Sequence, residues 1–413
     1  MPRRPAVAAS IAVALGVLGT LAACSSGPGP ADGSTTTAAA SPTTTPTSSS
    51  TSAAPAPPSP SPTTTATASC AQRVLGTMGL EQKVGQLVMV GAQSGLSPDR
   101  LDSVLRDQKA GGIVLLGNWT GAANVSAATK HWQPVGRAAA GGVGLLVAVD
   151  QEGGQVRHLR GAGFTATPSA LSQGRAGTAG AHATTVAREL EAVGVNVDLA
   201  PVADTVAASF ASRNAPIGAY QREYGNDATT VSRSVVAAVR GLQDGGVSAT
   251  LKHFPGLGRV TGNTDLTANG TTDSTTTAND AYLEPFRAGI QAGADLVMAS
   301  SALYPKLDPA NRAPFSRPIL TGLLREQLGF EGVVISDDLG AARAVADVPP
   351  AERATRFVAA GGDVVLTGLP STVPAMAGAL RDRAAAEPAF AAQVDAAAMR
   401  VLDLKVRRGV ATC

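Results

Sequence analysis

Short apolar runs alternate along this chain with longer segments in which apolar residues recur at helical spacing. Most of the short runs are continuous Val, Ile, Leu and Ala, without a polar residue at every second position. Such runs are typical of parallel strands that are covered on both faces. Eight of them are expected to be strands: residues 86–92, 112–117, 145–150, 196–201, 248–253, 296–300, 332–337 and 363–368.

Amphipathic segments between these runs are expected to be helices, and several of them end at glycine, which readily closes a helix. No Gly-x-Gly-x-x-Gly motif follows the first strand, which argues against a dinucleotide-binding sheet. Eight strand–helix units therefore predict an α/β fold of the (β/α)8 barrel type. The clearest helical segments are residues 181–193, 228–245, 281–292, 318–328 and 350–360, with a terminal helix at 387–408.

The first residues of the chain have the pattern of an export signal. Arg3 and Arg4 precede an apolar run that is too short to span a membrane comfortably. The run ends in Leu-Ala-Ala-Cys, which is similar to a bacterial lipobox, so residues 1–23 are expected to be a lipoprotein signal peptide and Cys24 to carry the lipid. The alternative is an ordinary signal peptide with an incidental cysteine. Lipidation would anchor the protein to the extracytoplasmic face of the cell membrane.

Residues 24–69 are almost entirely Ser, Thr, Pro, Ala and Gly, which predicts a disordered tether. Residues 70–413 then form one domain with enough apolar residues for a large core. Without Arg3 and Arg4 the chain carries 31 basic and 31 acidic residues. This balance gives no electrostatic reason to expect a nucleic-acid partner. Separately, we expect the protein to be a monomer.

Two cysteines, Cys70 and Cys413, flank the predicted domain almost to the residue. In an exported protein, two such thiols predict a disulfide that closes the domain. The alternative is a pair of free thiols.

Polar residues follow the carboxyl ends of the predicted strands, whereas the other ends carry mostly glycine and small residues. In (β/α)8 barrels the catalytic groups lie at the carboxyl ends of the strands. The polar residues at these ends are Asp150 with Glu152, Asp198, Lys252 with His253, Ser300 with Ser301, and Asp337 with Asp338.

Four of these strand ends resemble motifs of family-3 glycoside hydrolases, in particular the single-domain β-N-acetylglucosaminidase lipoproteins of actinobacterial type. The matching segments begin at Val149 (Val-Asp-Gln-Glu-Gly-Gly-Gln-Val), Asn196 (Asn-Val-Asp-Leu-Ala-Pro-Val-Ala-Asp), Lys252 (Lys-His-Phe-Pro-Gly) and Ile335 (Ile-Ser-Asp-Asp-Leu). The resemblance covers nearly all of residues 75–405. It implies a retaining exo-β-N-acetylglucosaminidase that acts on saccharides containing N-acetylglucosamine, with peptidoglycan fragments, or muropeptides, as the substrate.

By its place in the last motif, Asp337 is the expected nucleophile that forms a covalent glycosyl-enzyme. Its alternative role is a helix N-cap, which Asp338 could equally fill. The resemblance makes Asp150, Lys252 and His253 ligands of sugar hydroxyls, with a buried ion pair beneath the site as the alternative.

Three further residues lie where the chain departs from, or adds to, the family pattern. Glu152 is expected to brace the turn at residues 153–154. Arg222 is a candidate sugar ligand that follows an apparent two-residue insertion, and a surface arginine is the alternative. His158 occupies the place of an arginine that faces the sugar in the family.

The acid/base loop departs furthest from the family pattern. Asn263 and Asp265 stand where the family has an Asp–His pair, Leu257 replaces another histidine, and Ser301 replaces a histidine after the sixth strand. In the first hypothesis Asp265 is the acid/base, its pKa raised by enclosure, and Asn263 orients it. In the second, the proton donor is lost and the protein binds sugars without efficient turnover.

Three other functions stay open at this stage: a non-catalytic sugar-binding wall lipoprotein, a family-3 β-glucosidase and a phosphorylase. The glucosidase is disfavoured because those enzymes usually carry a second domain that completes the site. Few aromatic residues, with only Trp119 and Trp132 as tryptophans, favour a small pocket for terminal sugars over a long polymer cleft. No motif implies a metal ion or an organic cofactor.

Overall fold

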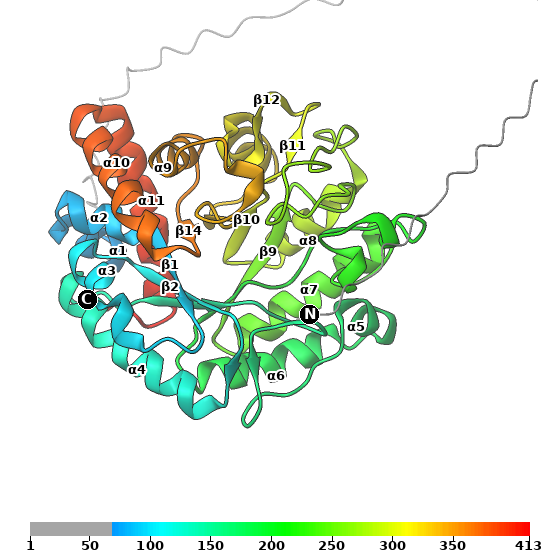
Figure 1. Ribbon diagram of the computed structural model, residues 1–413, viewed down its shortest axis with the longest axis horizontal. Coiled ribbons are helices and arrows are strands. Elements are labelled where there is room, and N and C mark those ends of the chain that lie inside the picture. The colour runs from blue at the N-terminus through cyan, green and yellow to red at the C-terminus, as the bar shows by residue number, and fades with distance from the viewer. Residues whose placement is uncertain (1–67) are drawn as a thin grey trace, which may run out of the picture. The chain divides into compact units, whose positions relative to one another are not determined.

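The computed structural model describes residues 68–413, so the predicted signal peptide, the lipidation site Cys24 and nearly all of the tether lie outside the described residues. Eight parallel strands form the central sheet (Figure 1). They are β1 (Val88–Gln93), β2 (Gly112–Leu116), β4 (Leu146–Val149), β8 (Val197–Asp198), β9 (Ser248–Phe254), β10 (Leu296–Ala299), β13 (Val333–Ser336) and β14 (Val365–Thr367).

The sheet closes on itself. Its strands follow the order β13-β10-β9-β8-β4-β2-β1-β14, and each neighbouring pair is parallel. A parallel bridge between Ile335 and Val364 joins β13 to the segment that leads into β14. This bridge completes the ring, which confirms the predicted (β/α)8 barrel.

Helices surround the strands, as the amphipathic pattern predicts (Figure 1). No helix within residues 68–413 has the length and apolar character needed to cross a membrane. The helices are α1 (Cys70–Thr77), α2 (Leu80–Gln86), α3 (Asp102–Asp107), α4 (Ala122–Ala139), α5 (Ala170–Ala176), α6 (Ala179–Glu191), α7 (Ala228–Asp244), α8 (Glu284–Gln291), the π-helix η6 (Pro318–Gln327), α9 (Pro350–Ala359), α10 (Val373–Ala386) and α11 (Pro388–Arg407).

The fourth strand is shorter than its apolar run predicts: β8 contains only Val197 and Asp198, whereas residues 196–201 were expected. Pro201 has no backbone N–H to donate, so the regular ladder cannot continue through it. The first strand also begins two residues later than expected, because helix α2 extends to Gln86.

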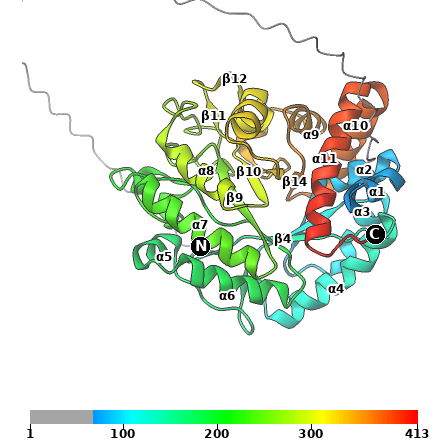
Figure 2. The ribbon, with the colours of Figure 1, turned by 180° about the vertical axis from the view of Figure 1, so that it is seen from behind.

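The barrel interior is filled by side chains from the strands. Helix α11 closes the end of the barrel at which the strands begin, which we call the lower end. Val401 and Leu404 of α11 pack against the interior cluster. Figure 2 shows α11 and the chain terminus from behind, beside α1 and α2. The interior cluster comprises Met89, Val114, Leu146, Ala148, Val197, Leu199, Leu296, Met298, Val333, Ile335, Val364 and Leu366.

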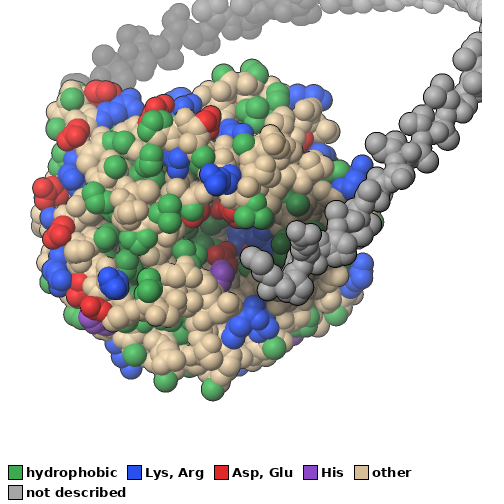
Figure 3. Space-filling model, viewed as in Figure 1, with side chains coloured by type: hydrophobic (Ala, Val, Ile, Leu, Met, Phe, Trp, Pro, Cys, Tyr) green, Lys and Arg blue, Asp and Glu red, His purple; other side chains and the backbone are tan. Residues whose placement is uncertain are grey.

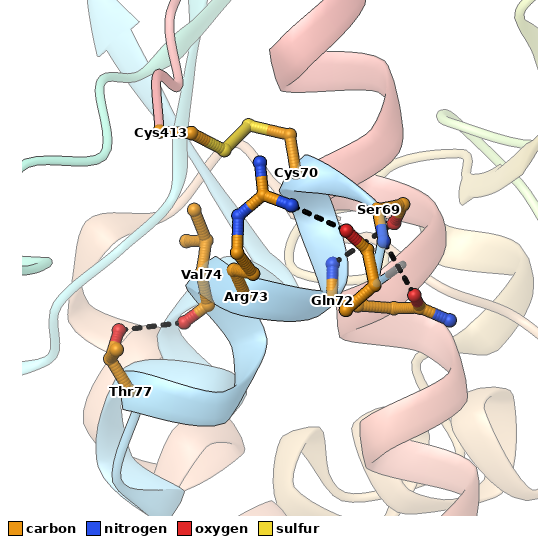
Figure 4. The surroundings of a disulfide bond; sticks show 8 residues. Ser69, Cys70, Gln72, Arg73, Val74, Thr77 and Cys413 are labelled. Carbon is orange, nitrogen blue, oxygen red and sulfur yellow. Dashed lines mark hydrogen bonds between the residues drawn. A yellow bond between two sulfur atoms is a disulfide. The ribbon is translucent and has the colours of Figure 1, made fainter. Parts of the chain in front are cut away.

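The structure pairs Cys70 with Cys413 in a disulfide that joins the start of α1 to the end of the domain (Figure 4). The Ser69 hydroxyl caps α1 by accepting a hydrogen bond from the Gln72 N–H, and the Gln72 side chain accepts from the Ser69 N–H in return. This capping box fixes the start of the helix next to the disulfide.

Two buried carboxylates at the lower end of the barrel are neutralised by arginines. Asp363, which lies just before β14, accepts hydrogen bonds from Arg325 at 2.6 Å and Arg400 at 2.9 Å. Asp295, which lies just before β10, forms ion pairs with Arg407 at 2.9 Å and with Arg408. Both clusters tie helices to the barrel and leave these carboxylates with partners on each oxygen.

Candidate active site

A cavity of about 310 Å³ opens at the carboxyl ends of the strands. Figure 3 shows a hollow near the middle of this face where acidic, basic and histidine side chains meet. Its volume lies at the low end of the range for ligand pockets, roughly 300–1,000 Å³, which suits one sugar residue. Its polar lining comprises Asp150, His158, Tyr220, Arg222, Lys252, His253, Asn263, Thr264, Asp265, Asp337 and Asp338.

A network of two cations and two carboxylates forms one wall. The Lys252 ammonium contacts both Asp150 and Glu152, the latter at 2.6 Å. Arg222 forms a bidentate pair with Glu152 through Nε at 2.8 Å and Nη2 at 2.7 Å. The structure therefore places Arg222 in the cavity wall, and the surface alternative is wrong.

The groups of this network hold one another in their charged forms. Burial opposes ionisation of Glu152, but the charges of Arg222 and Lys252 outweigh it and hold the pKa of Glu152 below its usual range. Burial likewise opposes the charged form of Lys252, and Asp150 with Glu152 outweighs it and raises the pKa of Lys252. The ion pairs that Glu152 forms with Lys252 and Arg222 are thus present across the ordinary pH range.

Asp150 and Glu152 have different relations to the cavity. The Asp150 side chain keeps 20% of its surface exposed, against 3% for Glu152. Asp150 can accept hydrogen bonds from a ligand, whereas Glu152 lies behind the two cations. Glu152 therefore anchors Lys252 and Arg222 instead of bracing the turn at residues 153–154, the role its motif position suggested.

Two histidines border this wall. The His253 Nδ1 lies 2.8 Å from a carboxylate oxygen of buried Asp204, which also accepts from the Leu257 N–H at 2.6 Å. Asp204 thereby orients the His253 ring and the start of the following loop. His158 contacts the Gly117 carbonyl through Nδ1, and its Nε2 lies 3.9 Å from Asp150.

The two aspartates after β13, Asp337 and Asp338, have different roles. Asp338 accepts hydrogen bonds from the N–H groups of Gly340 at 2.8 Å, Ala341 at 3.0 Å and Gly368 at 3.0 Å. It therefore caps the turn after β13, a role close to the helix N-cap that was the alternative for Asp337. The Asp337 carboxylate accepts a bond from the Asp338 N–H at 2.9 Å and faces the cavity.

Burial raises the pKa of Asp337, and the charge of Asp338 adds to this effect, while His253 partly opposes it. Among residues 68–413, no lysine or arginine forms a salt bridge with Asp337, although Lys252 lies near enough to favour its ionised form. Its carboxylate is thus free to meet a ligand.

Asp265 reaches the cavity from the loop that follows β9. Enclosure by the surrounding protein raises the pKa of Asp265 to about 7, with the charge of Asp337 as the next cause. The residue keeps solvent access at the cavity mouth, so protons can exchange with water. A carboxyl group with this pKa can both donate and accept a proton near neutral pH.

Backbone hydrogen bonds hold the Asp265 loop in place. The Asn263 side-chain oxygen accepts from the Asp265 N–H at 2.9 Å, so Asn263 positions the backbone of the aspartate. The carbonyls of Thr264 and Asp265 accept from the N–H groups of Ala344 at 3.0 Å and Arg343 at 3.2 Å. The loop thus rests on the segment that follows β13.

Three residues near the cavity were not given a role from the sequence. Asp204 and Asp198 both lie in the matched Asn196 motif, which marked them without indicating what they do. Burial raises the pKa of Asp198 to about 8, and its carboxyl accepts from the Gln151 N–H at 3.0 Å. Tyr220 lies in the apparent insertion and lines the cavity, with no local signal that indicated it.

Comparison with known proteins agrees with this geometry. The family model for the glycosyl hydrolase family 3 N terminal domain matches residues 79–404. A β-hexosaminidase of Xanthomonas campestris pv. campestris (strain B100) is 36% identical over 306 residues, which cover 70% of this chain and 86% of that protein.

Solved structures show the same relationship. The β-N-acetylhexosaminidase of Beutenbergia cavernae DSM 12333 is 46% identical with a TM-score of 0.76, covering 80% of this chain and 99% of its own. The family-3 β-N-acetylglucosaminidase of Paenibacillus sp. str. FPU-7 is 32% identical with a TM-score of 0.72, covering 82% and 64%. With its strand-end carboxylates and its barrel, the chain belongs to glycoside hydrolase family 3.

Proposed function

We propose that this protein is a retaining exo-β-N-acetylglucosaminidase. One observation carries the proposal: Asp337 and Asp265 line the same small cavity, and Asp265 has a pKa of about 7. Retaining glycosidases need one carboxylate as nucleophile and one carboxyl group as proton donor. The Beutenbergia relative is a β-N-acetylhexosaminidase and the Paenibacillus relative a β-N-acetylglucosaminidase, which supports N-acetylglucosamine as the sugar.

In the first step Asp337 attacks the anomeric carbon while Asp265 protonates the departing glycosidic oxygen. The glycosidic bond breaks, and a covalent glycosyl-enzyme forms on Asp337. In the second step Asp265, now ionised, takes a proton from water, and this water displaces Asp337. Two inversions at the same carbon retain its configuration.

The cation–carboxylate wall binds the hydroxyls of the sugar. Asp150 accepts hydrogen bonds, and Lys252 and Arg222 donate them, with charge-assisted strength. His253 and His158 add ring nitrogens at the border of this wall. Because the cavity holds about one sugar residue, a terminal residue enters it and internal residues of a chain do not.

Residues outside the described part extend the proposal to the cell surface. A lipid on Cys24 and the Ser/Thr/Pro-rich tether would hold the domain at the extracytoplasmic face of the membrane. Peptidoglycan fragments are the N-acetylglucosamine-containing saccharides available there, and they are the proposed physiological substrate.

The direct test incubates purified protein with 4-nitrophenyl N-acetyl-β-glucosaminide and with the corresponding glucoside, each with and without phosphate. We expect release from the N-acetylglucosaminide that does not depend on phosphate. Release that requires phosphate would select a phosphorylase, and preference for the glucoside would select a β-glucosidase. Sugar binding without release from either compound would select the non-catalytic binding protein.

A second experiment identifies the nucleophile. A 5-fluoro derivative of an activated N-acetylglucosaminide slows the second step, so the glycosyl-enzyme accumulates and its attachment site can be mapped by mass spectrometry. We expect the label on Asp337. A label on any other side chain would refute the assigned mechanism.

A further inference from the structure

Tyr220 is an exposed aromatic side chain at the active-site cavity. It retains 41% of its surface exposed, although it lines the cavity. Among the described residues of the lining, it is the only tyrosine, tryptophan or phenylalanine. An exposed aromatic ring at a ligand pocket offers a flat apolar surface that gains from being covered.

The turn that carries Tyr220 is held in one conformation. Tyr220 ends the short helix η3 (Gly218–Tyr220), and Gln221 follows with φ of 55°, a left-handed conformation that is uncommon for a residue other than glycine. The Gln221 carbonyl accepts from the Leu171 N–H at 3.3 Å, and its side-chain oxygen accepts from the Ser169 hydroxyl at 3.1 Å. The ring is therefore presented by a turn that is anchored on both backbone and side chain.

Buried Asn214 joins this turn to the loop that carries Asp265. Its side-chain oxygen accepts from the N–H groups of Ile217 at 3.1 Å and Gly218 at 2.8 Å. Its side-chain nitrogen donates to the carbonyls of Leu257 at 2.7 Å and Val260 at 2.8 Å, at the base of the Asp265 loop. The turn and the loop thus share one anchor, and Tyr220 and Asp265 both line the cavity.

The leaving group of the substrate must lie beside Asp265, because the proton donor stands next to the departing oxygen. The cavity has room for the terminal sugar alone, so the next ring lies at its mouth. We propose that Tyr220 is the platform on which this second ring packs, and that it gives the enzyme its preference for leaving groups that are sugar rings. This inference rests on the proposed function.

The test compares two substrates that share the terminal sugar and differ in the leaving group: N,N′-diacetylchitobiose, which leaves a ring, and N-acetyl-β-glucosaminyl fluoride, which leaves an ion. In Tyr220→Ala we expect the ratio of kcat/KM for chitobiose to that for the fluoride to fall about tenfold. Tyr220→Phe keeps the aromatic face and should keep the ratio near that of the wild type.

Leu96→Ala is the matched control, because Leu96 is also an exposed apolar residue, at 55%, and lies outside the cavity lining. We expect it to leave the ratio unchanged. An unchanged ratio in Tyr220→Ala, or an equal fall in Leu96→Ala, would overturn the platform.

The proposed role of Tyr220 can also be tested independently of the proposed activity. If the wild type cleaves neither substrate, calorimetry compares the binding of chitobiose and of free N-acetylglucosamine to the wild type and Tyr220→Ala. Weaker binding of chitobiose alone supports the platform, and equal changes for both sugars reject it.

Discussion

The two ends of the barrel, where the strands begin (the lower end) and where they finish (the upper end), treat their carboxylates in opposite ways. At the lower end, Asp363 and Asp295 each bind two arginines. At the upper end, Asp337 and Asp265 form no salt bridge with any residue of 68–413, and burial raises the pKa of both. The same residue type therefore serves cohesion at one end and remains available for chemistry at the other.

Cations also neutralise carboxylates at the upper end, where Lys252 and Arg222 pair with Asp150 and Glu152, but this neutralisation is selective. Glu152 pairs with both cations and Asp150 with Lys252, whereas the two aspartates proposed to react form no ion pair with either. A nucleophile held by an arginine would be a poorer nucleophile, and a proton donor held by one would lose its proton at neutral pH. The cost is a site that destabilises the fold locally.

Asp337→Asn is expected to have the largest effect. The amide cannot attack the anomeric carbon, so kcat should fall by on the order of 10⁴-fold or more. The free energy of unfolding should rise, because a buried charge next to Asp338 is removed. Enzyme kinetics and urea unfolding measure the two effects, and a less stable variant would contradict the contrast between the ends.

Asp265→Ala removes the proposed acid and should lower turnover of substrates with poor leaving groups by about 10²–10⁴-fold. Activated aryl glycosides, which need little protonation, should be affected less in their first step. Added azide, which needs no general base, should restore part of the turnover.

The pH profile gives an independent check on Asp265. A raised pKa means that the proton is held up to about pH 7 and lost above it. The wild-type kcat/KM for chitobiose should therefore decline above about pH 7, and Asp265→Ala should lack this decline. A decline that persists in the variant would assign the proton to another group.

Arg325→Met tests the lower end. It removes one of the two arginines on fully buried Asp363 and should lower the free energy of unfolding by about 3 kcal/mol. The kcat of the folded fraction should stay at the wild-type value. Arg106→Met is the control, because Arg106 forms an exposed i,i+4 pair with Asp102 that should contribute little. Loss of activity without loss of stability would contradict the assignment.

Asn263→Ala should have the smallest effect. It removes one hydrogen bond, to the Asp265 N–H, which is worth about 1 kcal/mol. We expect about a fivefold fall in kcat/KM for chitobiose, with folding stability little changed. Asn263→Ser can still accept this bond and should restore part of the activity. Equal loss in both variants would show that the contact does not position Asp265.

Much of the fold was predictable because the signals that specify it are local. All eight strands overlap the predicted ranges, and most of them are continuous apolar runs, because a strand covered on both faces packs apolar side chains on each side. The boundaries were less predictable: β8 ends at Asp198, three residues before Pro201, and helix α2 occupies the expected start of β1.

Most residues of the candidate site could be predicted from the sequence, but the contacts between them could not. Strand-end residues such as Asp150, Lys252 and Asp337 meet because parallel strands of a barrel bring their carboxyl ends together. Neither Glu152 as the anchor of Arg222 nor Tyr220 at the cavity mouth could be inferred, because each depends on contacts between distant loops.

The sequence by itself determined the barrel, the end at which polar residues gather and the pair of aspartates after the seventh strand. Only the tertiary structure decided which carboxylates are neutralised, since Glu152 and Arg222 are 70 positions apart and Asp150 and Lys252 are 102 apart. Secondary structure follows from side-chain periodicity along the chain, whereas charge and pKa follow from distances in space, which the periodicity does not contain.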